Sequence, residues 1–309
     1  MTTPIIIDCD PGQDDAVAVL TALGSPELDV LAITAVHGNV PLARTAPNAR
    51  ALVEFAGRPE VPVHAGCDRP LRRPAIHAVR IHGESGLRGF EPPPARRPVE
   101  AAHAAEFIVE TLKASEDVVL AALGPLTNLA SAFTWAPEVA KRVKQIVLMG
   151  GGRGVGNVTP VAEFNIYVDP EAAEIVFRAG APIVMIGLDT TWQALATPPR
   201  LAAWRKKGGK AGQAAAAMYD NPARFDAKRY GEEGLPLHDP CVIAYLLRPD
   251  LFDGRHCHVA VETGSPLTLG QTVVDWWGTT GQAANATVLS RVDADGYFRL
   301  LTERLARLG

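Results

Sequence analysis

The sequence predicts an α/β protein with an open, mostly parallel central sheet that carries helices on both faces. Apolar runs of strand length alternate with helical stretches along most of the 309 residues, and this alternation is typical of such sheets. Acids, histidines and asparagines fall mostly just after the apolar runs, at the edge where parallel sheets bind ligands. With 47% hydrophobic and 21% charged residues, the chain has the composition of a soluble globular protein.

The predicted elements follow from where each run begins and ends. Residues 4–8 form a short apolar, β-branched run that ends in an acid, and the next helix begins with acids that its dipole favours. The runs at 118–123 and 143–149 stop at glycine-containing segments. The strands are expected at 4–8, 28–36, 61–63, 118–123, 143–149 and 182–188. The helices are expected at 14–23, 42–56, 101–114, 170–179, 240–247 and 294–308.

Three further segments have less regular patterns. Residues 66–99 are rich in Pro, Arg and Gly and predict a long loop, which in a compact domain is usually functional or disordered. Residues 206–230 contain a Gly/Ala-rich helical stretch, and 231–234 are expected to be flexible. Beyond Arg255 the pattern is strand-like until the last helix. Because we find no repeat and no linker, we expect a single domain over residues 1–309.

Bulk properties exclude several classes of protein. The net charge is −4 and no Lys/Arg cluster is long, so we expect no nucleic-acid partner. No apolar run approaches membrane-helix length and no signal peptide is visible, so we expect no membrane association. The four cysteines lack CxxC spacing, which argues against a zinc cage and favours reduced thiols in the cytoplasm.

Four carboxylates lie within eight residues at the end of the first strand and the start of the first helix. Asp8 and Asp10 point the same way in an extended segment, and a turn at Gly12 returns Asp14 and Asp15 to them. Such crowding of charge favours a cation, and carboxylate oxygens suit Ca²⁺ or Mg²⁺. Helix capping explains one or two of the acids, and a phosphatase of the Asp-x-Asp type is a competing interpretation. The spacing excludes an EF-hand.

Residues 8–16 closely resemble the signature of the inosine-uridine-preferring nucleoside hydrolases. Further blocks resemble the same family in the family's order and together cover nearly the whole chain. A single block would be weak evidence, but an ordered set is specific. These blocks are 35–39, 81–86, 124–128, 147–152, 162–165, 169–173, 193–199 and 238–240.

The resemblance implies the fold, the reaction and the metal. The fold would be the Rossmann-like nucleoside hydrolase fold. The reaction would be hydrolysis of the N-glycosidic bond of ribonucleosides to ribose and free base, in nucleoside catabolism and salvage. One Ca²⁺ would be held by Asp10, Asp15, Asp239 and the backbone carbonyl of Leu123. Asp10 would also be the general base for the water that calcium holds.

The resemblance also implies the residues that contact the nucleoside. His238 would give a proton or a hydrogen bond to the leaving base, with His82 as a second histidine nearby. Arg229 and Tyr230, with Phe225, lie in a segment that would fold over the base. His37 is expected to be structural, and Asp8 to orient its neighbours. The expected ribose contacts are Asp14, Asn39, Asn157, Glu163 and Asn165, with Met149 and Phe164 packing against the sugar.

Some segments depart from the family pattern and leave the base preference open. Trp192 stands where close relatives often carry His, and it would shift specificity if it stacked on the base. The loop 231–237 also differs, and the pair Trp276-Trp277 matches no family residue of known role. A phosphatase-like metal hydrolase and a non-catalytic nucleoside-binding protein are the alternative functions. The resemblance further implies a homotetramer or homodimer.

Overall fold

The structure is a computed structural model that describes residues 2–220 and 234–309. A nine-stranded sheet runs through it in the order β10-β9-β11-β6-β5-β4-β1-β2-β3, and β7 and β8 form a separate pair. The strands are β1 (Thr3–Cys9), β2 (Leu28–Ala35), β3 (Val63–Ala65), β4 (Val119–Ala122), β5 (Gln145–Met149), β6 (Ile183–Ile186), β7 (Leu195–Ala196), β8 (Leu235–Pro236), β9 (Phe252–Val261), β10 (Thr272–Asp275) and β11 (Ala286–Val292).

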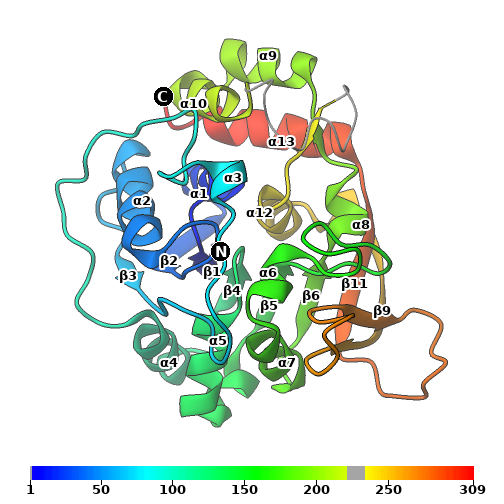
Figure 1. Ribbon diagram of the computed structural model, residues 1–309. Coiled ribbons are helices and arrows are strands. Elements are labelled where there is room, and N and C mark those ends of the chain that lie inside the picture. The colour runs from blue at the N-terminus through cyan, green and yellow to red at the C-terminus, as the bar shows by residue number, and fades with distance from the viewer. Residues whose placement is uncertain (1, 221–233) are drawn as a thin grey trace.

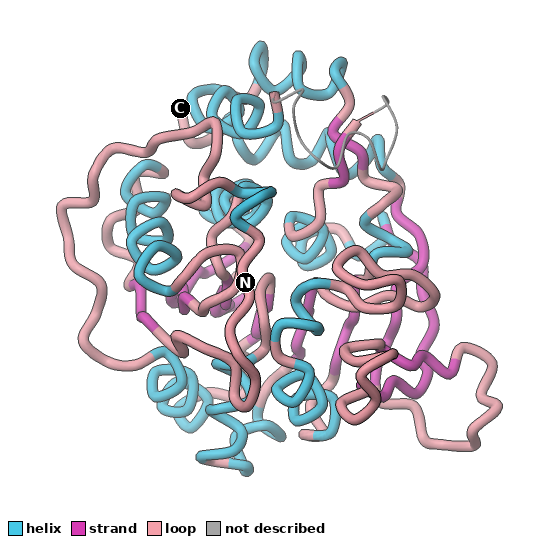
Figure 2. Tube along the Cα trace, viewed as in Figure 1, coloured by secondary structure: helices cyan, strands magenta, loops and turns pink. Residues whose placement is uncertain are grey.

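The sheet is mostly parallel, as the sequence predicts. Every pairing from β3 across to β11 is parallel, and only β9 pairs antiparallel with its two neighbours. Ile5 and Ile7 of β1 belong to one hydrophobic core and Ile6 belongs to another, because successive side chains point to opposite faces. Helices therefore cover both faces, as Figures 1 and 2 show.

The helices divide between these two cores. Those packing with Ile5 and Ile7 are α1 (Gln13–Leu23), α2 (Leu42–Phe55), α9 (Pro198–Lys207), α10 (Gly209–Tyr219), α12 (Pro240–Leu247) and α13 (Ala294–Ala306). Those packing with Ile6 are α4 (Ala104–Ala114), α5 (Thr127–Trp135), the 3-10 helix η1 (Pro137–Arg142) and α7 (Pro170–Arg178). The shorter helices are α3 (Val79–His82), α6 (Phe164–Val168), α8 (Leu188–Thr191) and the 3-10 helix η2 (Pro249–Leu251).

The strand order reverses between β1 and β4, which lie side by side at the centre of the sheet. The chain leaves β1 toward β2 and leaves β4 toward β5, on the opposite side, so their carboxyl ends diverge and leave a crevice. Asp10 follows β1 and Leu123 follows β4. The topology thus brings together two residues that are far apart in the sequence.

Several predicted boundaries differ from the structure. The third strand is Val63–Ala65 rather than 61–63, because pairing with Ile33 and Ala35 of β2 sets its position. Helices α5 and α9 were not predicted, and a short helix, α3, interrupts the predicted loop 66–99. The end of the 206–230 stretch and most of 231–234 lie outside the described residues.

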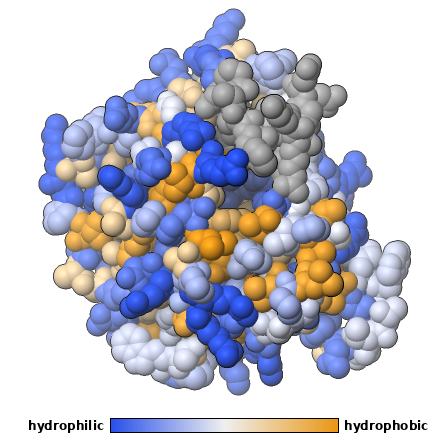
Figure 3. Space-filling model, viewed as in Figure 1, coloured by the Kyte–Doolittle hydropathy of each residue, from blue (hydrophilic) through white to orange (hydrophobic). Residues whose placement is uncertain are grey.

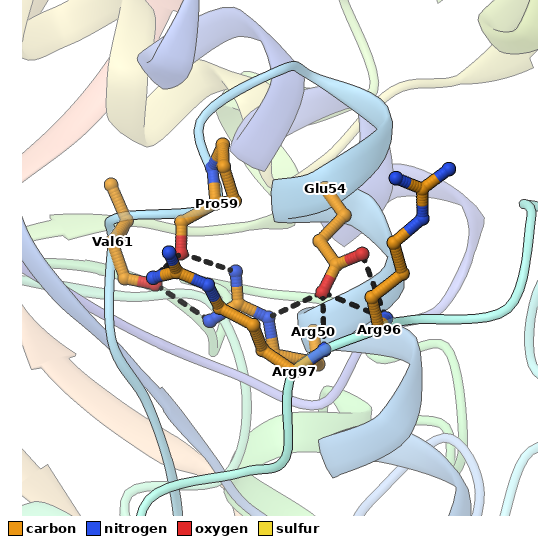
Figure 4. A network of polar contacts seen from close by, with 6 residues as sticks. All are labelled: Arg50, Glu54, Pro59, Val61, Arg96 and Arg97. Carbon is orange, nitrogen blue, oxygen red and sulfur yellow. Dashed lines mark hydrogen bonds and ion pairs between the residues drawn. The ribbon is translucent and has the colours of Figure 1, made fainter.

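The long loop 66–99 is hydrogen-bonded to helix α2 near the C-terminal end of the loop. The Glu54 carboxylate accepts backbone N–H groups of Arg96 at 2.8 and 2.9 Å and of Arg97 at 2.8 Å. Arg97 and Arg50 also donate to the carbonyl of Pro59, at 3.0 and 3.2 Å (Figure 4). In Figure 1 the loop runs outside α2 before it reaches α4. These bonds fix the path of the loop at residues 96 and 97.

The face seen in Figure 3 has hydrophobic residues gathered across its middle, with hydrophilic residues above and below. Within the described residues, no helix is both long enough and apolar enough to cross a membrane.

Candidate active site

A cavity of about 270 Å³ opens at the carboxyl ends of the central strands. Three groups of residues line it: acids and amides from the strand ends, residues of the segment that carries α3, and residues just before α12. The predicted site residues on its wall are Asp14, Asn39, His82, Leu123, Met149, Asn157, Glu163, Phe164, Asn165, His238 and Asp239.

Three carboxylates form a close group at this cavity, two of them, Asp14 and Asp239, on its wall. Asp14 and Asp15 lie in the first turn of α1, and Asp239 lies directly before α12. Each offers an oxygen within 4.8 Å of the other two, and all three are buried. Burial raises the pKa of Asp15 to about 7 and the pKa of Asp239 well above its ordinary value. A cation would remove the cost of ionising them together.

The Asp15 side chain is fixed by three hydrogen bonds. Its Oδ2 accepts the backbone N–H of Gly12 at 2.9 Å and the side-chain amide of Asn39 at 3.0 Å, and its Oδ1 accepts the backbone N–H of Asp10 at 3.2 Å. The turn at Gly12 therefore brings Asp15 back onto the end of β1, as the sequence predicts.

Asp10 lies beside this group and is fully buried. Its Oδ2 accepts the backbone N–H of Asn39 at 2.6 Å, and its Oδ1 has no hydrogen-bond partner among the described residues. Burial, and then the charge of Asp15, raise the pKa of Asp10 well above its ordinary value. A Cβ at Gly38 or Gly124 would collide with this carboxylate, so both positions require glycine.

The geometry of the acids differs in one respect from the expected ligand set. The close group contains Asp14 where the resemblance implies Asp10, and Asp10 is instead hydrogen-bonded through its backbone to Asp15. Spacing along the sequence could not distinguish the two, because Asp10 and Asp14 both lie within five residues of Asp15. The carbonyl of Leu123 lies on the cavity wall and accepts the side-chain amide of Asn165 at 2.7 Å.

The donor set fits a hard divalent cation. Carboxylate and carbonyl oxygens are the ligands that Ca²⁺ and Mg²⁺ take, and no histidine or cysteine joins the close group formed by the described residues. The buried Oδ1 of Asp10, which has no hydrogen-bond partner among residues 2–220 and 234–309, is also suited to face a cation or the water beside it.

Glu163 and Asn165 form a rigid wall on the other side of the cavity. Glu163 caps α6, accepting the backbone N–H of Asn165 at 2.9 Å, of Ile166 at 3.2 Å and of Gly151 at 2.9 Å. Burial raises the pKa of Glu163 to about 7. The Asn165 amide donates to the carbonyl of Met149 at 3.2 Å as well as to Leu123. This network fixes the side chains before any ligand arrives.

The two predicted base-side histidines both line the cavity. His82 ends α3, and its Nδ1 lies 3.2 Å from the backbone nitrogen of Gln13. His238 Nδ1 lies 2.7 Å from the Thr191 hydroxyl. His37 lies away from the cavity wall, buried beside Thr127 at 3.1 Å, and burial lowers its pKa to about 4. A structural role for His37 agrees with this placement.

Asp8 also lies behind the cavity rather than on it. Its Oδ2 accepts the Thr34 hydroxyl at 2.6 Å and the Asn128 amide at 2.8 Å. Burial raises its pKa to about 7. The Asn128 amide also donates to the carbonyl of Ala35 at 3.2 Å, so Asp8 ties the ends of neighbouring strands together. This is the supporting role expected of it.

Of the segments that depart from the family pattern, the structure describes some and leaves others outside the described residues. Trp192 packs against the hydrophobic core and is not among the described residues on the cavity wall. Trp276 is covered by the guanidinium of Arg153, 4.4 Å from the ring centre, far along the chain from the acids. Arg229, Tyr230, Phe225 and residues 231–233 lie outside the described residues.

Sequence reasoning missed several wall residues. They come from the long loop, from the segment after β5 and from β8. Their side chains reach the cavity only because the fold places these segments beside the ends of strands that are distant in the sequence. These residues are His77, Ala78, Arg80, Ile81, Val158 and Pro236. For the four that come from the long loop, closeness in the sequence to His82 was the one available signal.

Comparison with known proteins places this site in a family. The family model described as inosine-uridine preferring nucleoside hydrolase matches residues 5–299. Proteins named pyrimidine-specific ribonucleoside hydrolase RihA are similar to the chain: the one from Citrobacter koseri is 44% identical and the one from Photobacterium profundum 46%, each alignment covering 99% of both chains.

Solved structures agree in fold. A purine-preferring ribonucleoside hydrolase from Gardnerella vaginalis superposes with a TM-score of 0.91 at 35% identity, covering 99% of this chain and 98% of that one. A plant nucleoside hydrolase, PpNRh1, superposes with a TM-score of 0.92 at 35% identity, covering 99% of each chain.

The fold and the site therefore define a nucleoside hydrolase. The chain belongs to the inosine-uridine preferring nucleoside hydrolase family, and it is an enzyme that hydrolyses the N-glycosidic bond of ribonucleosides to base and ribose. The predicted family, fold class and reaction are confirmed.

Proposed function

We propose that the chain is a calcium-dependent ribonucleoside hydrolase in which Asp10 is the general base and His238 assists departure of the base. The observation that carries the proposal is the buried carboxylate group at the switch point of the sheet, directly beside a cavity lined by Asp14, Glu163 and Asn165. Asp10, Asp15, Asp239 and the Leu123 carbonyl would hold the ion. Calcium, when bound, would supply electrostatic polarisation of a water and of the ribose hydroxyls.

Asp10 is suited to take a proton from the attacking water. One of its oxygens is held by the backbone N–H of Asn39, which fixes the carboxylate, and the other has no partner in the part of the chain that the structure describes. Burial, and then the charge of Asp15, raise the pKa of Asp10 in the metal-free site. A base that is fixed within reach of the proton it takes acts efficiently.

The ribose would lie between the acids and the rigid wall of α6. The glycosidic bond breaks through an oxocarbenium-like transition state, in which positive charge develops on the sugar ring. Carboxylates of Asp14 and Glu163 on the cavity wall would stabilise that charge, and the amides of Asn39, Asn157 and Asn165 would orient the hydroxyls. Met149 and Phe164 supply apolar surface for the sugar.

The leaving base would be met by the histidines. A free nucleobase anion is a poor leaving group, so a proton or hydrogen bond from His238 would lower the barrier. The Thr191 hydroxyl at 2.7 Å orients this ring. His82 would form a second contact to the base, and Arg229 and Tyr230 stay predicted base contacts.

We further propose a preference for pyrimidine ribonucleosides. The support is that relatives 44–46% identical over nearly the full chain are named pyrimidine-specific. The single-domain organisation over 1–309, the homotetramer or homodimer, the cytoplasmic location and the role in salvage stay predictions that go with this function.

The test is a nucleoside panel assayed for released reducing sugar, with and without calcium. We expect ribose release in calcium, with uridine and cytidine used in preference to inosine. Absence of release from every ribonucleoside, while calcium is bound, would mean a nucleoside-binding protein without turnover. Faster release from inosine would contradict the pyrimidine preference alone.

A further inference from the structure

We propose that Gln13, which stands inside the acidic motif, is a positioning residue for the base side of the cavity. This inference rests on the proposed function, since it concerns how the same cavity activates the leaving base. Gln13 is fully buried at the start of α1, next to Asp14 in sequence. Its side-chain amide, however, is bonded to two segments away from the close carboxylate group.

The Gln13 side chain joins two distant segments of the chain. Its amide nitrogen donates to the carbonyl of Arg88 at 2.8 Å and to the carbonyl of Met218. Both acceptors are carbonyl oxygens, so only the nitrogen of the amide can face them. Arg88 follows the segment 77–82 that lines the cavity, and Met218 lies at the end of α10. One side chain thus ties both segments to the helix that carries Asp14 and Asp15.

The Gln13 backbone fixes the protonation pattern of His82. The backbone nitrogen lies 3.2 Å from His82 Nδ1. A backbone N–H can only donate, so Nδ1 must accept and the proton of the neutral ring must be on Nε2. A Cβ at Gly12 would lie 2.6 Å from this Nδ1, so the ring can approach only because residue 12 is glycine.

These contacts give His82 a defined chemical role. With Nδ1 occupied, the ring offers an N–H from Nε2, which can donate to a carbonyl oxygen or an unprotonated ring nitrogen of a nucleobase. Such a bond strengthens as negative charge develops on the leaving base. Gln13 keeps the histidine in place twice, directly through its backbone and indirectly through the Arg88 carbonyl.

The variant that tests this is Gln13→Met, which keeps the length of the side chain but removes both donors without adding charge. The same substitution at an exposed glutamine, Gln193→Met, serves as a control for the loss of two amide donors. Gln193 also donates its amide to two carbonyls, of Asp189 at 2.6 Å and of Ser290 at 2.9 Å, and it is not among the described residues of the cavity wall.

Each variant is assayed on uridine, on inosine and on p-nitrophenyl β-D-ribofuranoside, whose leaving group needs no proton. For Gln13→Met we expect kcat/KM on the two nucleosides to fall about 10- to 100-fold. The loss should appear mainly in kcat, with less than about a threefold change on the p-nitrophenyl riboside and unchanged calcium affinity. Gln193→Met should leave all three substrates nearly unchanged.

Equal loss on all three substrates, or no loss on any, would overturn the inference. A merely structural role for Gln13 predicts the first of these, together with a lowered melting temperature.

A second measurement keeps the inference testable if Gln13→Met does not fold. Nitrogen-15 NMR of the wild-type imidazoles should show His82 protonated at Nε2, and a proton on Nδ1 instead would overturn the inference. If the wild type cleaves no substrate, the proposed function fails, and the tautomer of His82 still decides whether Gln13 positions that ring.

Discussion

The two sides of the cavity are built in different ways. On the sugar side, Asp15 and Glu163 each accept three hydrogen bonds, from residues at strand ends and helix starts. On the base side, the wall comes from the long loop around α3 and from residues just before α12, and Gln13 ties the loop to α1. In the proposed function, the strand ends would carry the chemistry shared by all nucleosides, and the loops would carry the contacts that differ between bases.

This division agrees with the relatives. Proteins named pyrimidine-specific and a structure named purine-preferring resemble the same chain over nearly its full length. Loops tolerate sequence change better than the strand ends that hold buried acids. We therefore expect that base preference can change within one fold without disturbing the proposed sugar side, and the following predictions test that separation.

The largest effect is expected from Asp10→Ala. The change removes the proposed base and a charge from the buried site, so kcat should fall by at least about 10⁴-fold on every substrate, including a p-nitrophenyl riboside. Reducing-sugar assays measure this loss, and circular dichroism checks that the variant folds. A loss confined to natural nucleosides would show that Asp10 acts on the base side instead.

Removing calcium should affect all substrates equally. Chelation should lower kcat/KM on the order of 10³-fold, and added calcium should restore it. Such a loss on the p-nitrophenyl riboside as well would place the ion on the sugar side. Recovery with zinc but not with calcium would contradict the assignment of a hard cation.

The stabilisation by calcium should depend on pH. Burial raises the pKa of Asp15 to about 7, so the metal-free folded protein binds a proton there more tightly than the unfolded chain does. Its stability therefore falls as pH rises from about 4 to about 7. Calcium requires the ionised carboxylate, so the gain in melting temperature on adding calcium should grow between pH 5 and pH 8. A gain that is constant with pH would contradict this.

His238→Ala should separate the two sides. We expect about a 100-fold loss of kcat on natural nucleosides and little change on a p-nitrophenyl riboside, because an activated leaving group needs no proton. Side-by-side assays with both substrate types make the comparison. Equal loss on both would mean that His238 supports the neighbouring Asp239 rather than the base.

The smallest effect is expected from Glu54→Ala, which releases the loop 66–99 beyond α3. Glu54 is half-buried, and hydrogen bonds from the backbone N–H groups of Arg96 and Arg97 lower its pKa. Water can replace those bonds, so kcat/KM should stay within about twofold of the wild-type value. Hydrogen exchange at Arg96 and Arg97 should become faster. A larger loss on nucleosides alone would show that this fastening also holds the base side in place.

The part of this molecule that the sequence predicts is the part governed by local pattern. The strand at the N-terminus, the helix after it and the acid cluster between them all follow from residues close together in the chain. The fold class follows from the alternation of such units. The third strand was misplaced because its position depends on pairing with β2, which no local pattern encodes.

The site required information that spacing lacks. Leu123 and Asp239 were identified through resemblance to a family, since they reach the acids only across the folded sheet. The contact between Gln13 and His82 joins residues 69 positions apart, and no pattern in either segment predicts it. That Asp14 rather than Asp10 lies in the close carboxylate group likewise depends on a turn geometry that a motif does not specify, and the ligand set stays a prediction.

The glycines packed against Asp10 have a consequence for engineering. Gly38 and Gly124 leave no room for even a methyl group beside that carboxylate. In a saturation library, every variant with a residue other than glycine at either position would be inactive, whatever substrate is screened. A search for variants with a new base preference would therefore succeed fastest if it left both glycines unchanged and randomised His77, Arg80 and Ile81.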